Sequence, residues 1–282
     1  MATSSLGCSM KPFVKWAGGK TQLLPAISEQ IPSFETYYEP FLGAGALFLH
    51  LKPEKAVVND INSQLINVWI QIRDRLGDVL KVLEWLDGKE CDTFFYSFIR
   101  DEYNDKIDDN ALDPDGAGMF IWLNKHCFNG LYRVNRHGFF NVPWNHKGRI
   151  SSFSRENLEN ISRYLNESDI EFRNGDFEDA VSGADEGDFV YFDSPYVPES
   201  ITADFTQYAK DGFGEQDHLR LFYLYRILSG KGVKCLLSNN DVPFVREMYR
   251  EWNIDSLDVS RAINRNGSRR SGREVLVRNY II

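Results

Sequence analysis

The chain has 282 residues, of which 43% are hydrophobic and 14% aromatic, and its formal net charge is −9 at pH 7. This length and composition predict one large or two smaller folded domains with a full core. No run approaches the roughly 18 apolar residues of a membrane span, and the N-terminus does not resemble a secretion signal. The four cysteines are widely separated and form no C-x-x-C pair. We therefore expect no metal site, no disulfide framework and a reducing, cytoplasmic location.

The negative charge is unevenly distributed along the chain. Residues 84–115 contain eleven acidic and three basic residues, whereas residues 125–150 contain five Lys or Arg, three His and no acidic residue. Residues 261–273 contain five arginines and again no acidic residue. Each basic stretch alone could equally be an ordinary solvated surface. Together they predict a surface that contacts the phosphate backbone of a nucleic acid, because local charge governs the attraction of a polyanion.

The first segment of interest, FVKWAGGKTQLL at 13–24, contains Gly-Gly-Lys-Thr but is not a P-loop. The P-loop pattern G-x-x-x-x-G-K-[ST] requires a glycine where this chain has Val14. No GxSxG or HExxH motif occurs either. The segment therefore matches neither a motif that binds nucleoside triphosphates nor a hydrolase motif.

The remaining elements alternate between strand and helix. ETYYEPFLGAGALFLHL is predicted to be a short strand, a glycine-rich turn and the start of a helix. Apolar residues then recur with a helical period from Ser63 to Leu86, where Gly77 permits a break, and 94–103 and 116–128 are also expected to be helical. Further strands are predicted in the segments KAVVND, IEFRNGDF, DFVYFDSPY, VKCLLSN and REVLVRNYII. Strands thus concentrate at 37–60 and 169–282, which predicts an α/β sheet with a smaller, mainly helical insert.

Two features follow the first two strands, where open α/β sheets bind ligands. Gly43 and Gly45 let the backbone approach a ligand, but Phe48 replaces the third glycine of a dinucleotide fingerprint. Asp60 ends the next strand, where a carboxylate can accept both hydroxyls of a ribose. This combination favours a nucleoside-bearing cofactor without a diphosphate, such as S-adenosylmethionine. A plain glycine-rich turn with a helix-capping Asp explains the pattern equally well.

The tetrapeptide Asp193-Ser194-Pro195-Tyr196 follows the apolar strand DFVYF. The exocyclic amine of adenine is a poor nucleophile because its lone pair is delocalised into the ring. A carboxylate from Asp193 and the backbone carbonyl of Ser194 could hold its two N–H groups and favour a pyramidal nitrogen. Pro195 would fix the turn, and Tyr196 would stack on an extruded base. A strand-end D-x-P-Y is also a common turn.

These motifs together resemble those of the Dam-type DNA adenine-N6 methyltransferases, which include the GATC-modifying enzymes of restriction systems. The resemblance extends from about Lys11 to the C-terminus and includes KWAGGK, YYEPFLGAGALF, VVNDIN, FNGLYRVNRHGFFNVP, GDFEDA, FVYFDSPY, LLSN and RNY. It implies a Rossmann-like, S-adenosylmethionine-dependent methyltransferase sheet formed by 1–65 and 166–282. It also implies a target-recognition domain at 66–165, double-stranded DNA as substrate and base flipping. The members that belong to restriction systems have a cognate restriction endonuclease as a partner, and the sequence leaves open whether this chain does.

The resemblance assigns the residues of the opening segment to the cofactor. Trp16 and Lys20 are expected to line the S-adenosylmethionine pocket, Asp60 to bind the ribose, and Asp176 and Phe177 to hold the adenine. Asp193 would lie between cofactor and target base. The complete set expected to bind the cofactor is Trp16, Lys20, Glu39, Phe41, Gly43, Asp60, Asp176, Phe177 and Asp193.

Target recognition is expected in the segment HCFNGLYRVNRHGFFNVPWNHKGR. Phe128 can insert into the base stack, and Arg133 can read a guanine through O6 and N7; the resemblance implies that this guanine belongs to GATC. Arg133 could instead contact only phosphates. The residues expected to contact DNA are Lys125, Phe128, Asn129, Gly130, Arg133, Asn135, Arg136, Asn141, Arg265, Arg269 and Arg270.

Two departures from the family pattern concern catalysis and recognition. Ser194 replaces the first proline of D-P-P-Y, but its expected role belongs to the backbone carbonyl, so the chemistry should be retained. After Pro143 the chain reads Trp144-Asn145-His146-Lys147 where many relatives have Gly-Arg-Tyr, so the recognition sequence could differ.

Other activities fit the sequence less well. Cytosine-C5 methylation needs a Pro-Cys nucleophile, which is absent, and cytosine-N4 methylation typically has Ser in place of Asp193. A nicotinamide dehydrogenase is disfavoured by the missing third glycine. RNA or protein amide methylation and a DNA-binding regulator without catalysis remain as alternatives.

Overall fold

The computed structural model describes residues 10–198, 212–260 and 271–282. Within these residues the chain forms two compact units. The first unit comprises Met1–Thr21, Gly43–Glu54 and Asp60–Asn174, and the second comprises Gln22–Leu42, Lys55–Asn59 and Gly175–Ile282. Each unit is therefore built from segments that are far apart in the sequence.

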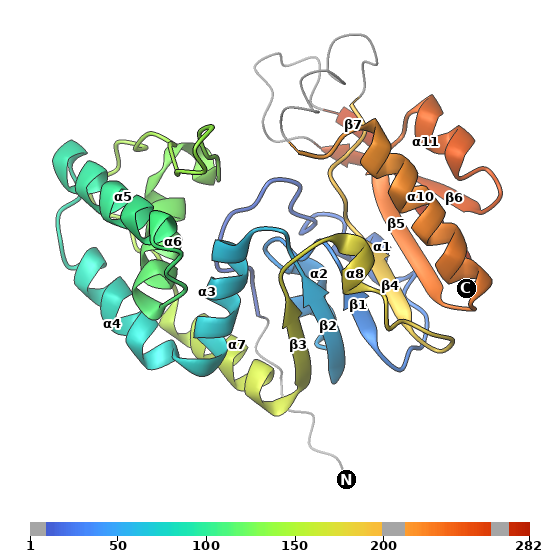
Figure 1. Ribbon diagram of the computed structural model, residues 1–282, viewed down its shortest axis with the longest axis horizontal. Coiled ribbons are helices and arrows are strands. Elements are labelled where there is room, and N and C mark those ends of the chain that lie inside the picture. Colours follow the sequence, from blue (N-terminus) through green and yellow to red (C-terminus); the bar gives the residue numbers. More distant parts are fainter. Residues whose placement is uncertain (1–9, 199–211, 261–270) are drawn as a thin grey trace. The chain divides into compact units, whose positions relative to one another are not determined.

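Most of a seven-stranded sheet belongs to the second unit (Figure 1). The strands of the sheet that belong to this unit are β1 (Tyr37–Glu39), β2 (Lys55–Asn59), β4 (Phe189–Phe192), β5 (Lys234–Asn240), β6 (Asn253–Ser260) and β7 (Ser271–Arg278). They lie in the order β2-β1-β4-β5-β7-β6. The first four are parallel to one another, whereas β7 is antiparallel to both β5 and β6. The carboxyl ends of β1, β2, β4 and β5 therefore share one edge.

The sequence of these strands explains their burial. All four residues of β4 are buried, and β5 is buried from Cys235 onward, as expected for parallel strands covered on both faces. Helix α10 (Glu215–Gly230) packs against β5, and the Tyr225 hydroxyl donates a hydrogen bond to the Cys235 carbonyl at 3.1 Å. The shorter helices of this unit are α1 (Leu24–Ser28), α8 (Phe177–Ala180) and α11 (Pro243–Met248).

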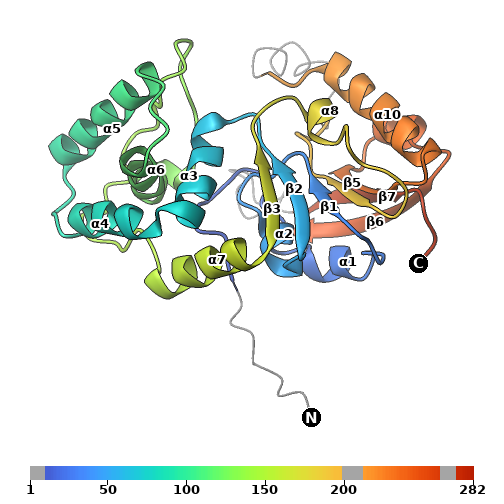
Figure 2. The same ribbon diagram turned by 60° about the horizontal axis from the view of Figure 1, so that its bottom comes forward.

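The first unit is mainly helical. It contains α2 (Ala46–Leu51), α3 (Ser63–Asp74), α4 (Leu76–Asp87), α5 (Thr93–Asp108), α6 (Pro114–His126), the 3-10 turn η1 (Phe128–Gly130), α7 (Arg155–Glu167) and β3 (Asp169–Arg173). Helix α6 packs against α3, α4 and α5 (Figure 2). A Cβ atom on Gly118 would lie 2.6 Å from Val82 Cγ1, so this glycine permits the close approach of α6 to α4.

The predicted mixed α/β architecture is confirmed, and the predicted strands and helices all occur. The break between residues 63 and 86 lies at Arg75 rather than at Gly77, because Arg75 leaves the helical conformation with φ −136°. Elements α7, α10 and β6 and the short helices α1, α8 and α11 were not predicted from the sequence. The boundaries 1–65, 66–165 and 166–282 stay predictions.

The described residues show neither a membrane-spanning helix nor a cluster of metal-binding side chains. None of their helices is long and apolar enough to cross a membrane. They contain no group of three His, Cys, Asp or Glu side chains that could hold a metal ion. Cys91, Cys127 and Cys235 are free and buried, and burial raises the pKa of the Cys91 thiol to about 11.

Acid should destabilise the protein through His218, because burial lowers the pKa of this imidazole to about 4 from an ordinary 6.5. In that range the unfolded chain binds a proton that the folded chain does not, so stability is lost as pH falls from 6.5 towards 4. The loss should reach roughly 3 kcal/mol. Urea unfolding across this range should show a shallower decline for His218→Gln than for the natural chain. Equal declines would contradict the assignment.

Candidate active site

The carboxylate of Asp60 lies just after β2 and is fixed by two backbone N–H groups. Oδ2 accepts a hydrogen bond from Gly43 N and Oδ1 accepts one from Asn62 N, each at 2.9 Å. Burial raises the pKa of Asp60, and these two bonds oppose the rise. Each carboxylate oxygen can still accept another hydrogen bond. The side chain is thus oriented against the glycine-rich turn and can receive two hydroxyl groups.

The opening segment contributes Trp16 to the same place. Gly43 has φ +49°, and a Cβ atom there would lie 2.8 Å from Trp16 Cδ1, so only glycine permits this contact. The structure therefore brings Trp16, Gly43 and Asp60 together in the first unit. The Lys20 side chain is buried and donates a hydrogen bond to the Gly18 carbonyl at 2.6 Å. The Gly-Gly-Lys segment thus forms a turn closed by its own lysine.

In the second unit, aromatic rings surround the residues predicted to hold adenine. The rings of Phe41 and Phe177 are stacked with centroids 5.3 Å apart. Asp176 Oδ1 caps α8 by accepting from Glu178 N at 2.9 Å, and it also accepts from Arg220 at 2.8 Å. The Arg220 guanidinium lies 4.8 Å from the Phe177 ring centroid. Arg220 therefore positions both members of the Asp176-Phe177 pair.

The carboxylate of Asp193 follows β4 and is held by a chain of hydroxyl groups. Ser238 Oγ donates to Asp193 Oδ1 at 3.0 Å, and Tyr191 Oη lies 3.1 Å from Ser238 Oγ. Since Ser238 uses its single proton on Asp193, Tyr191 must donate to Ser238. Burial raises the pKa of Tyr191, so the phenol keeps the proton that this chain requires. On the neighbouring strand, Glu39 accepts a hydrogen bond from Tyr37 at 2.8 Å.

The rest of the tetrapeptide is anchored to β5 and β7. The Tyr196 hydroxyl donates to Glu274 Oε2 at 2.7 Å, and burial raises the pKa of Tyr196. Asn239 and Asn240 bond the backbone N–H and carbonyl of Val197 at 2.9 and 2.7 Å. Pro195 is exposed. The Ser194 hydroxyl is buried and has no hydrogen-bond partner among the described residues.

The predicted recognition segment presents exposed side chains directly after α6. The Phe128 side chain is 52% exposed, although aromatic rings are usually buried. Asn129 is also exposed and has φ +57°. Arg133 is exposed, and its guanidinium donates to the Asn141 side chain at 2.8 Å and to the Asn141 carbonyl at 3.2 Å. Asn141 therefore holds Arg133 with part of its fork already oriented.

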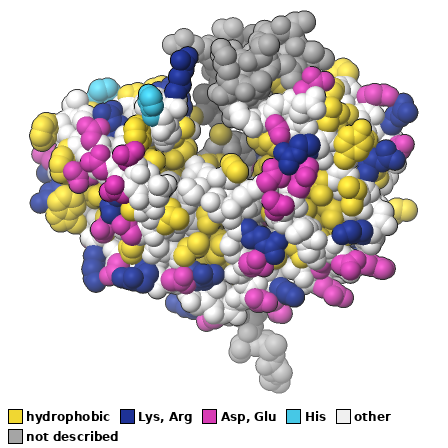
Figure 3. Space-filling model, viewed as in Figure 1, with side chains coloured by type: hydrophobic (Ala, Val, Ile, Leu, Met, Phe, Trp, Pro, Cys, Tyr) yellow, Lys and Arg dark blue, Asp and Glu magenta, His cyan; other side chains and the backbone are white. Residues whose placement is uncertain are grey.

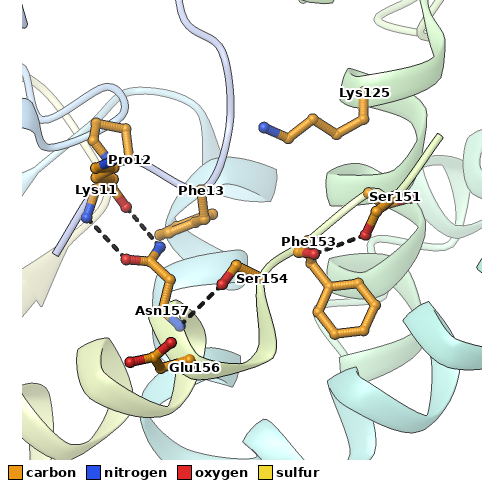
Figure 4. A pocket seen from close by; sticks show the side chains of 10 residues that line it. Lys11, Pro12, Phe13, Lys125, Ser151, Phe153, Ser154, Glu156 and Asn157 are labelled. Carbon is orange, nitrogen blue, oxygen red and sulfur yellow. Dashed lines mark hydrogen bonds between the residues drawn. The ribbon is translucent and has the colours of Figure 1, made fainter.

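Other predicted DNA contacts have different local roles. The Asn135 side chain accepts from His137 N at 2.8 Å, so it stabilises the turn of this segment, and Arg136 beside it is exposed. Lys125 extends from α6 into a cavity of about 430 Å³ that Lys11 also lines (Figure 4). Burial lowers the pKa of Lys125. The remaining predicted contacts, Arg265, Arg269 and Arg270, lie outside the described residues.

The charge segregation predicted from the sequence is visible on the surface. Acidic side chains lie beside apolar ones over α5, whereas both acidic and basic side chains lie over α4 (Figure 3). The segment after α6 instead exposes Arg133, Arg136 and His137. Helix α5 and this segment therefore differ in the sign of their charge.

Three residues that hold predicted site residues in place were not expected from the sequence. These are Arg220, Ser238 and Glu274. Ser238 lies in the LLSN segment of the family resemblance, which was a usable signal. Arg220 and Glu274 contact their partners 44 and 78 residues away in sequence, and no local pattern indicates such pairs.

Comparison with known proteins identifies the family of the chain. Residues 16–263 match the model of the D12 class N6 adenine-specific DNA methyltransferase family. The chain is 40% identical to the type II methyltransferase M1.LlaDCHI of Lactococcus lactis subsp. cremoris over 277 residues, which cover 96% of each protein. It is 38% identical to the type II methyltransferase M.MjaIII of Methanocaldococcus jannaschii over 291 residues, 96% of this chain and 99% of the relative.

A further relative is the DNA adenine methylase of Escherichia coli K12, which is 32% identical over 275 residues, 96% of this chain and 95% of the relative. The family match and these relatives span nearly the whole chain, including the segments that carry Trp16, Asp60, Arg133 and Asp193. The chain belongs to the D12 class N6 adenine-specific DNA methyltransferases.

Proposed function

We propose that this adenine-specific DNA methyltransferase transfers a methyl group from S-adenosylmethionine to N6 of an adenine within GATC in duplex DNA, after flipping that base. The observation that supports this most directly is the anchoring of Asp193 and Tyr196. Ser238 holds the carboxylate and Glu274 holds the phenol. A carboxylate and an aromatic ring fixed at one strand end are what an extruded adenine requires.

The residues of the structure fit S-adenosylmethionine as the cofactor. Asp60 is oriented to accept ribose hydroxyls, and Gly43 leaves room for the Trp16 indole beside the turn. Phe41 and Phe177 provide apolar rings for an adenine, with Asp176 next to them. The cofactor supplies an electrophilic methyl group on a sulfonium.

The chain's own residues would make the adenine amine reactive. Asp193 accepts one N–H of the amine and the Ser194 backbone carbonyl accepts the other, which draws the nitrogen towards pyramidal geometry. Because Ser238 fixes Asp193 beforehand, little reorganisation is needed when the amine acquires positive charge. Tyr196 stacks on the base, and its bond to Glu274 fixes the plane of the ring. Asp193 would also accept the proton that the methylated amine releases.

Recognition of the sequence is assigned to the exposed segment after α6. Phe128 would fill the space that the flipped adenine leaves, and Arg133 would read a guanine while Asn141 orients it. GATC as the recognition sequence is proposed from the family resemblance.

Two relatives are named type II methyltransferases, which supports a cognate restriction endonuclease as a partner. We place the activity in the cytoplasm, where buried free thiols such as Cys235 stay reduced.

Replacing Asp193 with Ala should abolish methyl transfer while binding to duplex DNA persists, because the amine loses its charged acceptor. The measurement is transfer from labelled S-adenosylmethionine to a GATC duplex and to one with that adenine replaced, followed by nucleoside analysis. N6-methyladenine should form only in the first duplex. Asp258→Ala, which removes a carboxylate paired with exposed Arg273, is the matched control and should retain activity.

Three results would contradict this assignment. Retained turnover in Asp193→Ala would remove the carboxylate from the mechanism. Label on both duplexes would keep the chemistry but overturn GATC as the site. Cofactor binding without any transfer by the natural chain would favour a DNA-binding regulator.

Replacing Arg133 with Ala should relax discrimination at one base pair by about 1–3 kcal/mol, because a bidentate guanine contact is lost. Competition between GATC duplexes that differ at single positions measures the loss. Arg133→Lys keeps the charge but not the planar fork, so it should restore affinity for DNA without restoring discrimination. If Arg133→Ala kept the natural sequence preference and only bound more weakly, Arg133 would be a phosphate contact.

Replacing Ser194 with Ala should raise the free energy of unfolding by about 1 kcal/mol, because it removes a buried hydroxyl without a partner. The backbone carbonyl remains, so the reaction should still give N6-methyladenine, as it should for Ser194→Pro. Urea unfolding and the product assay test the two expectations separately. A destabilised Ser194→Ala variant would show that the hydroxyl has a partner in solution.

A further inference from the structure

The Trp16 side chain, assigned above to the cofactor, stacks on Tyr132, the residue immediately before Arg133. Their ring centroids are 5.3 Å apart and their planes differ by 30°. Phe120 of α6 extends this stack, with centroids 5.2 Å from Tyr132 and 6.1 Å from Trp16. Three rings thus join the cofactor segment at 13–20 to the recognition segment at 126–149.

A buried amide makes a second connection between these two segments. Asn124 is 2% exposed, and its Oδ1 accepts a hydrogen bond from Lys15 N at 2.7 Å. Its Nδ2 donates to the Lys15 carbonyl at 2.9 Å and to the Gly130 carbonyl at 3.0 Å. Asn124 therefore holds both segments by their backbones. A shift of one segment would break hydrogen bonds to the other.

Gly130 packs so closely against Lys15 that a side chain would not fit between them. Gly130 has φ +68°, and a Cβ atom there would lie 2.4 Å from Lys15 Cδ. Closely packed groups such as these move together or not at all, because protein interiors are dense. The recognition segment is consequently packed directly on the residue that precedes Trp16.

On its other side Trp16 contacts the proposed ribose site. Its indole fills the space left by Gly43, whose N–H bonds Asp60. The half-buried phenol of Tyr132 also lies near Asn62, whose N–H bonds the same carboxylate. A continuous path of contacts therefore runs from Asp60 through Trp16 and Tyr132 to Arg133, entirely within the first unit.

From these contacts we infer that Tyr132 is a positioning residue that couples cofactor binding to DNA recognition. Cofactor bound against Trp16 and Asp60 fixes the indole, the indole fixes Tyr132, and Tyr132 fixes the backbone that carries Arg133. Because coupling between two binding sites is reciprocal, DNA bound at Arg133 raises the affinity for the cofactor equally. This inference rests on the proposed function, since it requires both ligands.

The test compares DNA affinity with and without S-adenosylhomocysteine, which has no methyl group to transfer. The dissociation constant of a GATC duplex should fall on the order of 5- to 150-fold when this probe saturates the natural chain. Tyr132→Leu removes the ring and should lower the ratio well below that of the natural chain, although the Asn124 connection remains. Tyr132→Phe keeps the stack and should retain most of the ratio. The affinity for S-adenosylhomocysteine, measured with and without duplex, should change by the same factor in each variant.

Phe139→Leu is the matched control, because it removes an aromatic ring from the same segment that pairs with His137 rather than with Trp16. It should keep the natural ratio even if its DNA affinity falls. A purely structural role of Tyr132 would lower both affinities and leave their ratio unchanged, and that result would overturn the inference. If Tyr132→Leu does not fold, Tyr132→Met keeps more volume without an aromatic plane and takes its place.

Failure of the proposed function would look different from failure of this inference. A natural chain that binds no S-adenosylhomocysteine, or transfers no methyl group to DNA, would overturn both. A natural chain that methylates GATC with a binding ratio of 1, or a Tyr132→Leu variant with the natural ratio, would overturn only the coupling.

Discussion

The direction of the parallel strands is the constraint on which the chemistry of this protein depends. Strands β1, β2, β4 and β5 run parallel, so their carboxyl ends lie at one edge of the sheet. Strand β1 lies between β2 and β4, which makes it the point where the strand order reverses and where open α/β sheets bind ligands. Glu39 ends β1, Asp193 follows β4, and Ser238 lies in the last half of β5, so all three are near this edge. The carboxylates of Glu39 and Asp193 therefore lie at one edge of the sheet.

Placing carboxylates at a largely buried edge is costly unless each is bonded, and the second unit meets this requirement with hydroxyl groups. Tyr37, Tyr196 and Ser238 donate to Glu39, Glu274 and Asp193 respectively. Burial raises the pKa of both tyrosines, which keeps them as donors at neutral pH. The same bonds that stabilise the fold therefore orient the tetrapeptide that we propose to be catalytic. Fully bonded polar networks of this kind are rigid, which suits the proposed role of this site in receiving a flipped base.

The sequence predicted what local patterns encode and missed what depends on distant partners. The buried strands were predictable because DFVYF and KCLLSN contain the short apolar runs FVYF and CLL. Asp60 and Asp193 were predictable because each follows an apolar strand. Helix α7 was missed because RENLENISRYLNE is mostly polar, although Leu158, Ile161 and Leu165 are buried on one face. Helix α10 was missed because exposed Tyr223 and Ile227 obscure its period. Glu274 and Tyr132 owe their roles to contacts that only folding creates.

The net charge of −9 gives a physical reason for coupling recognition to the cofactor. Non-specific DNA affinity comes almost entirely from neutralised phosphates, and the acidic residues of α4 and α5 weaken that attraction. Under the proposed function, such a chain gains more of its affinity from base contacts, which require Arg133 to be held in a defined orientation. Asn141 supplies part of that order in the free protein, and the stack of Trp16 on Tyr132 can supply the rest when the cofactor is bound. The enzyme would thus have a weak non-specific attraction to DNA and an Arg133 that is fully ordered only when the cofactor is bound. This combination favours binding of the recognition site by enzyme molecules that already carry the methyl donor.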